Sequence, residues 1–326
     1  MKTLHLALFA YALLASPGNA FAQSQAPSLV KQQEQCVAFL FGTVHPLDES
    51  GIPMKDSAGK PIALYQPLGT AFIVFYPDSR GGLDYGFVYL VTAKHVLRDA
   101  NGKFFRKVDL RMNAKSQGVE FIKDIPVSNE SEQLLWYHSE KDADEAVALD
   151  FLPSRDKFDF KVIPVDMFVD DALLKSADVQ EGDSLYFIGL LAQFYGEKRN
   201  YPVVRRGTLA MTTDEDIPTK AGSAHLFIAE LQSWPGNSGS PVFLSLGGMR
   251  HGGVVTGENF RFFGILLGVF NSVIPVDVLE TSKALVGSKN PLPVGVSLIV
   301  PAMSLRQLLD SKEAQSSRDR MVKNKQ

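Results

Sequence analysis

The chain has a single cysteine, Cys36, among its 326 residues. An intramolecular disulfide is therefore impossible, and a zinc site built on several thiolates is excluded. The run QCVAFLFGTV around Cys36 is apolar and strand-like, which predicts a buried, unreactive thiol; an intermolecular bridge or a reactive thiol is the alternative. No two histidines have the spacing of metal ligands, so the sequence indicates neither a metal nor another cofactor.

Concentrated positive charge is also missing. The formal net charge is -3, and no block rich in Lys or Arg precedes the last dozen residues. Binding to nucleic acid depends on a dense positive footprint on one face of the protein. The composition therefore excludes nucleic acid as a partner, and it carries no sign of the oligomeric state.

Long apolar runs are scarce, and the first one has the features of a secretory signal. In MKTLHLALFAYALLASPGNAFAQ, Lys2 precedes an apolar stretch from Leu4 to Ala15, and small residues stand at Ala20 and Ala22. This pattern predicts a signal peptide over residues 1–22, cleaved after Ala22, and hence a secreted or periplasmic protein. The stretch is too short for a membrane anchor, and no later run is long enough either.

The rest of the chain consists mainly of short apolar runs, rich in Val, Ile, Phe and Tyr, with turn residues between them. Two of these, GTAFIVFY (69–76) and YGFVYLVTA (85–93), flank PDSRGGLD and predict a hairpin. Many short strands indicate an all-β barrel or sandwich architecture. The charged segment 153–162 is the best candidate for a linker, because it divides the strands into two comparable sets.

The predicted organisation thus has six parts. A helix is expected at SLRQLLDSKEA, with Ser304 as its cap, and a solvated tail after it. In chain order the parts are the signal (1–22), a flexible segment (23–35), a first β unit (36–152), the linker (153–162), a second β unit (163–302), and the C-terminal helix and tail (303–326).

His95 is the candidate general base. In VYLVTAKHVL it follows a strongly apolar strand that ends in a turn, which places the imidazole at a strand terminus on a rigid scaffold and open to a cleft. The other histidines of the mature chain are interpreted as structural or exposed residues.

Asp144 is the candidate partner of this base. A histidine that activates a serine needs a carboxylate to hold its tautomer and to stabilise the imidazolium that forms. Three aspartates occur in DADEAVALDF, and Asp144 stands closest to the start of the apolar run AVAL. Asp142 and Asp150 are interpreted as solvated flanking residues. Taken by itself, the segment favours three surface charges.

Ser238 is the candidate nucleophile. It lies in GNSGSPVF, where the N–H groups of Gly236 and Ser238 can converge as an oxyanion hole if the backbone bends as glycine permits. Gly239 leaves room for the substrate and for the histidine. Alone, this stretch could be an ordinary turn. After His95 and Asp144, it completes a set of base, carboxylate and nucleophile.

The order of these residues separates the known classes of serine hydrolase. His, Asp, Ser is the chymotrypsin order, whereas α/β-hydrolases and subtilisins have other orders, and Ser240 breaks the G-x-S-x-G motif. On TAKHV, DEAV and GNSGSPVF, the chain resembles the trypsin/chymotrypsin-like serine peptidases, in particular bacterial secreted forms of the glutamyl-endopeptidase and HtrA-like kind, without a PDZ domain. The resemblance implies two perpendicular six-stranded antiparallel β-barrels with the active cleft between them and a short C-terminal helix.

Two departures from that family are informative. Animal trypsins have an aspartate before the serine, which pairs with a new N-terminus during zymogen activation; Asn237 carries no charge for such a pair. By the resemblance, Gln232 lies at the base of the primary specificity pocket and offers no carboxylate for Lys or Arg side chains. His225 could recognise an acidic side chain or be a strand-edge residue. The segment GVFNS, with Asn271, resembles the strand that pairs with substrate.

Together these observations predict a serine endopeptidase that acts on proteins or peptides through an acyl-enzyme. Two alternatives stay open. One is a binding or scaffolding protein that keeps the fold without turnover, and the other is an acyl hydrolase for small esters.

Overall fold

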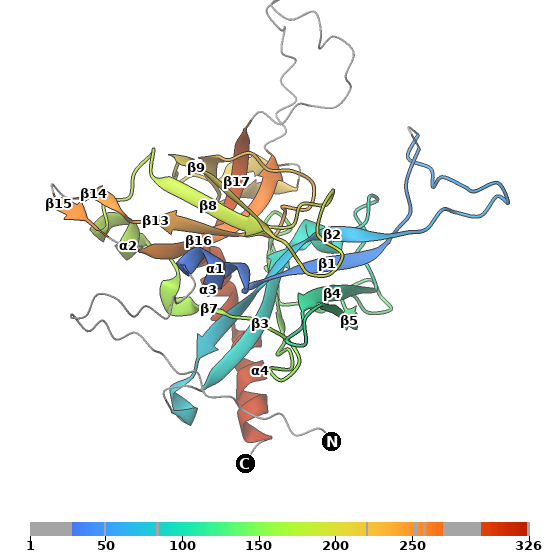
Figure 1. The fold of residues 1–326 in the computed structure, drawn as a ribbon, viewed down its shortest axis with the longest axis horizontal. Helices are drawn as coiled ribbons and strands as arrows, with labels where there is room; N and C mark the ends of the chain where they lie inside the picture. Colours follow the sequence, from blue (N-terminus) through green and yellow to red (C-terminus); the bar gives the residue numbers. More distant parts are fainter. Residues whose placement is uncertain are drawn as a thin grey trace, which may run out of the picture.

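The computed structural model describes residues 28–48, 50–82, 85–219, 221–250, 253–256, 259–269 and 295–324 (Figure 1). The predicted signal peptide lies outside the described residues. No helix of the described part has both the length and the apolar character needed to cross a membrane.

The first unit is an antiparallel sheet with the order β5-β4-β1-β2-β3-β6, and β7 (Ile163–Pro164) pairs in parallel with β2. The sheet curls, because Tyr137, in the segment after β5, bridges Ala148 of β6 through two backbone hydrogen bonds of 2.7 and 3.1 Å. Its six main strands are β1 (Val37–Val44), β2 (Leu64–Pro77), β3 (Gly86–Ala93), β4 (Lys107–Asn113), β5 (Val119–Pro126) and β6 (Ala146–Asp150).

The second unit is a closed barrel with the order β12-β17-β16-β13-β8-β9, and all of its pairs are antiparallel. Two small hairpins, β10–β11 and β14–β15, extend from it. The all-β fold predicted from the sequence is therefore confirmed. The strands are β8 (Ser184–Gly189), β9 (Val203–Met211), β10 (Ile217–Thr219), β11 (Gly222–Ala224), β12 (Phe227–Glu230), β13 (Pro241–Ser245), β14 (Gly248–Arg250), β15 (Gly253–Val255), β16 (Phe260–Val269) and β17 (Val296–Pro301).

Aromatic side chains join the two units. Phe262 of β16 is fully buried, and its ring centroid lies 5.4 Å from that of Phe72 in β2 and 4.6 Å from that of Phe168 between the units. Burial of an aromatic side chain of this size is worth roughly 1.5–3 kcal/mol. The shared core fixes the position of one unit against the other, and so the position of the groups that each unit presents at their junction.

Two helices close the chain, α3 (Ala302–Leu309) and α4 (Lys312–Lys323), drawn in red in Figure 1. α3 begins directly after Pro301, before the predicted cap Ser304, and Ser311 caps α4 by accepting from the Ala314 N–H at 3.3 Å. The stretch expected to be a solvated tail thus forms most of α4. Arg318 of α4 is buried and donates to the hydroxyl of Tyr89 in β3, so the C-terminus packs on the first unit.

The N-terminal part of the described chain is also helical. α1 (Leu29–Glu34) lies within the segment expected to be flexible, and the side chain of Ser28 accepts from the Lys31 N–H at its start. Gln33 of α1 accepts a hydrogen bond from the hydroxyl of Tyr186, which ties the helix to the second unit. Cys36, just after α1, is buried, and this burial raises the pKa of its thiol to about 12, as expected of an unreactive residue. A further helix, α2 (Asp171–Ser176), precedes β8.

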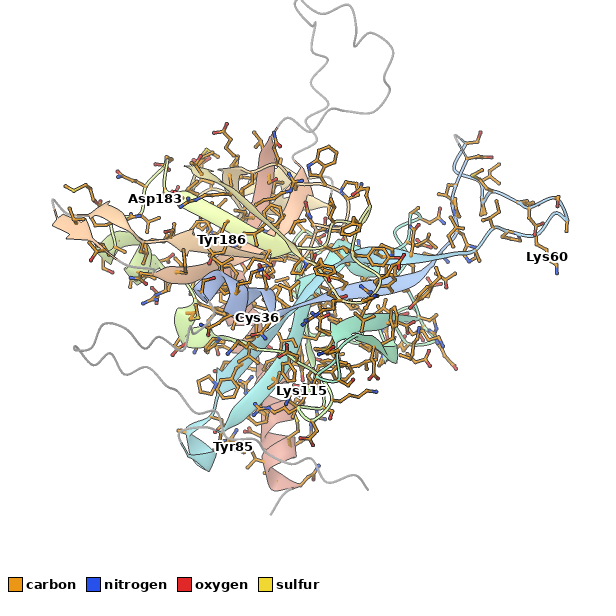
Figure 2. The ribbon with its side chains drawn as sticks, viewed as in Figure 1. Cys36, Lys60, Tyr85, Lys115, Asp183 and Tyr186 are labelled. Carbon is orange, nitrogen blue, oxygen red and sulfur yellow. The ribbon has the colours of Figure 1, made fainter. Side chains whose placement is uncertain are left out.

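Four turns of the first unit have the same pattern of hydrogen bonds and backbone conformation. An Asp or Asn side chain accepts from the backbone N–H groups two and four residues later, and the residue three places on has a positive φ. Such side-chain turns hold a loop without a hydrophobic core of its own. Two successive copies build an arm between β1 and β2 that projects from the sheet and carries Lys60 at its far end (Figure 2). The four turns begin at Asp48, Asp56, Asp99 and Asn129.

Candidate active site

His95 stands where the predicted strand gives way to a turn. β3 ends at Ala93, and residues Lys94–Leu97 form a single 3-10 turn. The strand end is anchored to β2 because the hydroxyl of Thr92 donates to the Thr70 carbonyl at 2.7 Å. Within this fixed turn the side chain of His95 is 40% exposed, so a rigid backbone presents an accessible imidazole.

The carboxylate beside His95 belongs to Glu145, not to the predicted Asp144. One oxygen, Oε2, lies 2.8 Å from His95 Nδ1 and accepts from the His95 backbone N–H at 2.9 Å. No hydrogen bond joins the side chain of Asp144 to His95 among the described residues. The backbone hydrogen bond from Lys94 N–H to the Glu145 carbonyl, 2.7 Å long, holds Glu145 in this position.

The contact between Glu145 and His95 also determines which imidazole nitrogen donates a hydrogen bond and whether the carboxyl group is ionised. A carboxylate only accepts hydrogen bonds, so Nδ1 of His95 donates to Glu145, and in the neutral imidazole Nε2 is then the basic nitrogen. Burial alone would raise the pKa of Glu145, but the hydrogen bonds and the charge of His95 outweigh it and hold that pKa below its usual value. Glu145 is therefore ionised at neutral pH and can stabilise an imidazolium.

A second layer of charged side chains supports the loop that carries Glu145. Lys94 is 2% exposed, and its ammonium donates to the carbonyls of Lys141 and Asp142 at 3.4 and 3.0 Å. Arg98 donates to the Asp142 carboxylate at 2.8 Å. Asp142, expected to be a solvated flank, thus helps to hold the turn in front of Glu145.

Ser238 directly follows Asn237, a buried and uncharged residue that holds the local backbone. The side chain of Asn237 is fully buried, donates to the Leu190 carbonyl at 2.6 Å and accepts from the Trp234 N–H at 2.7 Å. The carbonyl of Ser238 accepts from Thr70 N–H at 2.9 Å, which ties the segment to the first unit. Asn237 therefore serves as a backbone brace.

The bend around Ser238 requires its glycines. Gly236 and Gly239 have φ values of +95° and +83°. A Cβ on Gly239 would lie 2.2 Å from the Thr70 carbonyl oxygen, so any larger residue would push the two units apart. This is the bend that the sequence required for converging N–H groups.

A hydrogen bond to the Pro235 carbonyl fixes the orientation of the peptide bond between Pro235 and Gly236. The Pro235 oxygen accepts from the Ala192 N–H at 3.2 Å. Because C=O and N–H of a trans peptide point in opposite directions, the Gly236 N–H is turned away from Ala192. Within the described chain, neither this N–H nor that of Ser238 donates to another group. Both donors are available to an oxyanion.

The hydroxyl of Ser238 donates to the Leu267 carbonyl at 2.9 Å, and no hydrogen bond joins it to His95 among the described residues. Both side chains nevertheless line one cavity of about 510 Å³ at the junction of the units. Val44, His45, Leu64 and Leu68 of the first unit also line it. The structure thus brings Ser238 and His95 to the same space while the hydroxyl points to Leu267.

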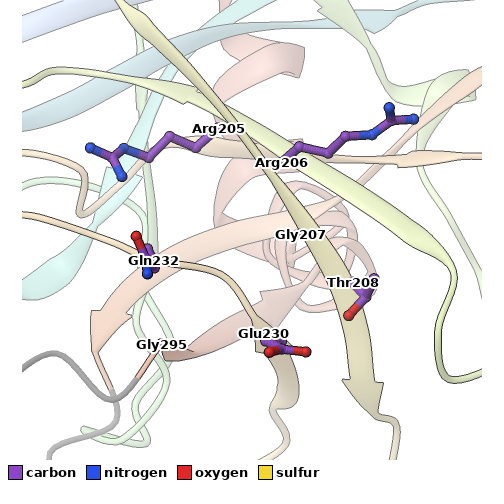
Figure 3. A pocket seen from close by; sticks show the side chains of 7 residues that line it. All are labelled: Arg205, Arg206, Gly207, Thr208, Glu230, Gln232 and Gly295. Carbon is purple, nitrogen blue, oxygen red and sulfur yellow. The ribbon is translucent and has the colours of Figure 1, made fainter.

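The three residues assigned to substrate recognition have different outcomes. Gln232 is exposed and lines a separate cavity with residues of β9 (Figure 3). His225 is exposed, and its ring stands edge-on to Phe227 at 5.5 Å, which fits the strand-edge alternative. Asn271 lies outside the described residues. In the part of the chain that the structure describes, no three acidic, His or Cys side chains group as metal ligands.

No family model matches the sequence, and no curated protein is similar to it. Among solved structures, the chain is similar to the HtrA-type protease AlgW with a decapeptide, with a TM-score of 0.43 and 16% identity over 86% of this chain and 65% of that one. It is also similar to the MamO protease domain from Magnetospirillum magneticum, with a TM-score of 0.44 and 13% identity over 86% and 98% of the two chains.

A third match is Rv3671c from M. tuberculosis H37Rv in an inactive form, with a TM-score of 0.39 and 12% identity over 89% and 96% of the two chains. The chain spans less than two thirds of the AlgW chain that it matches. Matches of this degree carry no inference about activity.

Proposed function

We propose that the chain is a serine endopeptidase with Ser238 as nucleophile, His95 as base and Glu145 as the residue that orients the base. The observation that carries the proposal is the contact of Glu145 with His95 Nδ1 at 2.8 Å, because it leaves Nε2 basic in the cavity that Ser238 shares. The free N–H groups of Gly236 and Ser238 support the same conclusion, since acyl transfer needs donors for a developing oxyanion.

The chemistry follows from these positions. Ser238 Oγ attacks a substrate carbonyl while its proton passes to His95 Nε2, and Glu145 stabilises the imidazolium. The carbonyl oxygen becomes an oxyanion that accepts from Gly236 and Ser238 N–H. His95 then gives the proton to the leaving amine, the C–N bond breaks, and water hydrolyses the acyl-enzyme by the reverse proton path.

One rearrangement must precede attack. The Ser238 hydroxyl has to leave the Leu267 carbonyl and turn about its Cα–Cβ bond toward His95. An extended substrate that pairs with this part of β16 would donate its own N–H to the Leu267 carbonyl. Substrate binding and release of the nucleophile are then one event, which favours peptides over small esters as substrates.

The apolar segment before Ala22 suggests that the protein acts outside the cytoplasm. The hydrogen bond from Ser238 to Leu267 favours a second candidate function, a peptide-binding protein without turnover, because in this arrangement the hydroxyl is not directed at its base.

Hydrolysis of a library of internally quenched peptides tests the proposal. The wild-type protein is expected to cleave members of the library, and Ser238→Ala to lower turnover on the order of a millionfold. Ser240→Ala is the matched control, because Ser240 is a buried serine two residues away whose hydroxyl has no partner in the described chain. A folded wild-type protein that binds peptides and cleaves none would instead establish the binding function.

A further inference from the structure

A buried arginine of the first unit holds a loop of the second. Arg111, in β4, is 3% exposed, and its guanidinium extends to the connection between β8 and β9, residues 190–202. It donates four hydrogen bonds there, of 2.6 to 3.3 Å, which gather the acceptors of this loop around one cation. The acceptors are the backbone carbonyls of Tyr195, Gly196 and Glu197 and the side-chain oxygen of Asn200.

The loop in turn binds the strand that carries Arg111. The side-chain amide of Asn200 donates to the Arg111 carbonyl at 2.8 Å, and the Asn200 backbone N–H donates to the side chain of Asn113 at 2.7 Å. The guanidinium carbon lies 5.1 Å from the centre of the Tyr195 ring, and this ring packs edge-on against Phe41 of β1. The two units are therefore joined here by contacts in both directions.

Neutral groups alone compensate the charge of Arg111. Among the described residues, its guanidinium pairs with no carboxylate, and burial lowers the pKa of the group. A buried charge is costly, and where packing is the only requirement an apolar side chain of similar volume is at least as stabilising. The cation is therefore explained by the loop that it holds rather than by the core around it.

The other end of the same loop holds the segment that leads to Ser238. The Ala192 N–H donates to the Pro235 carbonyl at 3.2 Å, and the Leu190 carbonyl accepts from the side chain of Asn237 at 2.6 Å. Loop and segment thus exchange hydrogen bonds on either side of the glycine whose N–H is an oxyanion donor.

That glycine, Gly236, is also tied to the loop through Thr70. The Leu190 N–H donates to the Thr70 hydroxyl at 2.9 Å, and this hydroxyl donates to the Gly236 carbonyl at 2.8 Å. A Cβ on Gly236 would lie 3.0 Å from the side chain of Leu190 and 3.1 Å from the nitrogen of Ala192, so loop and glycine pack closely. Because the Gly236 N–H points away from Ala192, its direction depends on where the loop lies.

Little chain separates the two ends of this connection. Ala192 and Tyr195, the first acceptor of Arg111, are three residues apart and span at most about 10 Å. A hydrogen bond of 3.0 Å from the Phe194 N–H to the Leu191 carbonyl folds this stretch into a turn. A shift of the carbonyls away from Arg111 is therefore passed on to Ala192 and to the peptide group that it holds.

We infer that Arg111 is a positioning residue for the oxyanion hole: by holding the loop 190–202 against the first unit, it fixes the direction of the Gly236 N–H. The inference rests on the proposed function. Arg111 forms no hydrogen bond with Ser238 or His95 in the described part of the chain, so it acts only through the loop. The oxyanion donor, like the pair of nucleophile and base, then depends on both units.

Steady-state hydrolysis by Arg111→Met tests the inference. Loss of an oxyanion donor lowers kcat by about 10²–10³-fold. Arg111→Met leaves the donor in place but loosely held, so kcat should fall at least about tenfold. KM should change by less than about twofold, because the oxyanion forms only in the transition state.

Arg318→Met is the matched control. Arg318 is 4% exposed and, among the described residues, likewise donates to neutral oxygens, those of Tyr89 and Leu309. This variant should lose stability, as Arg111→Met does, while the folded protein keeps the kcat of the wild type. An equal fall of kcat in both variants would overturn the inference.

Arg111→Lys keeps the charge, but an ammonium cannot reach four acceptors at once, so its kcat should lie between those of the wild type and Arg111→Met. If Arg111→Met does not fold, Arg111→Lys decides alone. A kcat within about twofold of the wild type in the deciding variant, or a rise in KM without a fall in kcat, would overturn the inference.

Hydrogen exchange measured by NMR separates the inference from the proposed function, since it needs no substrate. The Ala192 N–H, which donates to Pro235, should exchange at least about tenfold faster in the Arg111 variants and at the wild-type rate in Arg318→Met. If exchange responds to Arg111 but the wild type cleaves no peptide, Arg111 positions the segment and the endopeptidase proposal fails. If peptides are cleaved and exchange ignores Arg111, the endopeptidase proposal stands and the inference fails.

Discussion

The two sides of the candidate active site are held in place by different physical means. On the first unit, His95 and Glu145 are supported by charges, since Lys94, Arg98 and Asp142 brace the loop that carries Glu145. On the second unit, Ser238 is held by backbone hydrogen bonds and by the neutral amide of Asn237. The first side should therefore respond to pH and to single charge changes, whereas the second should respond to the loss of buried hydrogen bonds.

Among the substitutions that compare the two sides, the largest loss of kcat is expected when the carboxylate of Glu145, rather than that of its neighbour Asp144, is replaced. Glu145→Gln should lower kcat by roughly ten-thousandfold, because an amide can hold the wrong tautomer of His95 and cannot stabilise the imidazolium. Asp144→Asn should leave kcat within about twofold, since no hydrogen bond joins its carboxylate to His95 among the described residues. Steady-state peptide hydrolysis by the two variants decides between them, and a severe loss in Asp144→Asn alone would restore the original prediction.

Asn237→Ala should be the most destabilising change on the serine side. It leaves the Leu190 carbonyl and the Trp234 N–H without their partner in a buried place, at a cost of about 2–5 kcal/mol in the free energy of unfolding. Asn101→Ala, in an exposed turn, is the control and should change stability by less than about 0.5 kcal/mol. Urea unfolding of both variants measures the difference, and equal stability would show that Asn237 is no brace.

Lys94→Met tests the charged support of the histidine side. It removes the donor to two loop carbonyls and should cost about 1–3 kcal/mol in unfolding free energy. It should also lower kcat more than it changes KM, because the loop positions Glu145. Lys103→Met removes an ion pair whose partners are both exposed and should change stability by at most about 1 kcal/mol. If the two lysine variants behave alike, the loop needs no support from Lys94.

A smaller effect is expected of pH on the free energy of unfolding. The pKa of Glu145 lies below its usual value in the folded protein, so its ionised form stabilises the fold. This contribution is fully present above the ordinary glutamate pKa of about 4.3 and is lost as the pH falls through the lower folded value. The stability difference between wild type and Glu145→Gln should therefore shrink as the pH drops from neutral into that range. A difference that stays constant with pH would mean that His95 does not favour the ionised carboxylate.

Sequence patterns located the strands and the two ends of the site well. Periodicity and turn residues predicted the hairpin that became β2 and β3, and His95 stands just beyond the strand end, as expected. Ser238 and its glycines lie in the expected bend. These features depend on local chemistry, namely which residues favour strands and which tolerate positive φ, and local chemistry can be read from neighbouring residues.

The features that were missed depend on tertiary contacts. Asp144 and Glu145 are adjacent, and only the tertiary contact with the turn that carries His95 distinguishes them. The polar sequence of α4 shows little apolar periodicity, because Arg318 is buried against the hydroxyl of Tyr89 rather than in an apolar core.

Reaction of the protein with a fluorophosphonate, followed by mass spectrometry of the labelled peptide, tests most directly whether Ser238 is a nucleophile activated by His95. One adduct is expected, on Ser238, formed at a rate that falls at least about a thousandfold in His95→Ala. No adduct is expected in Ser238→Ala, while Ser240→Ala should label like the wild type. A folded wild-type protein that forms no adduct, or a labelling rate that does not depend on His95, would contradict these roles of Ser238 and His95.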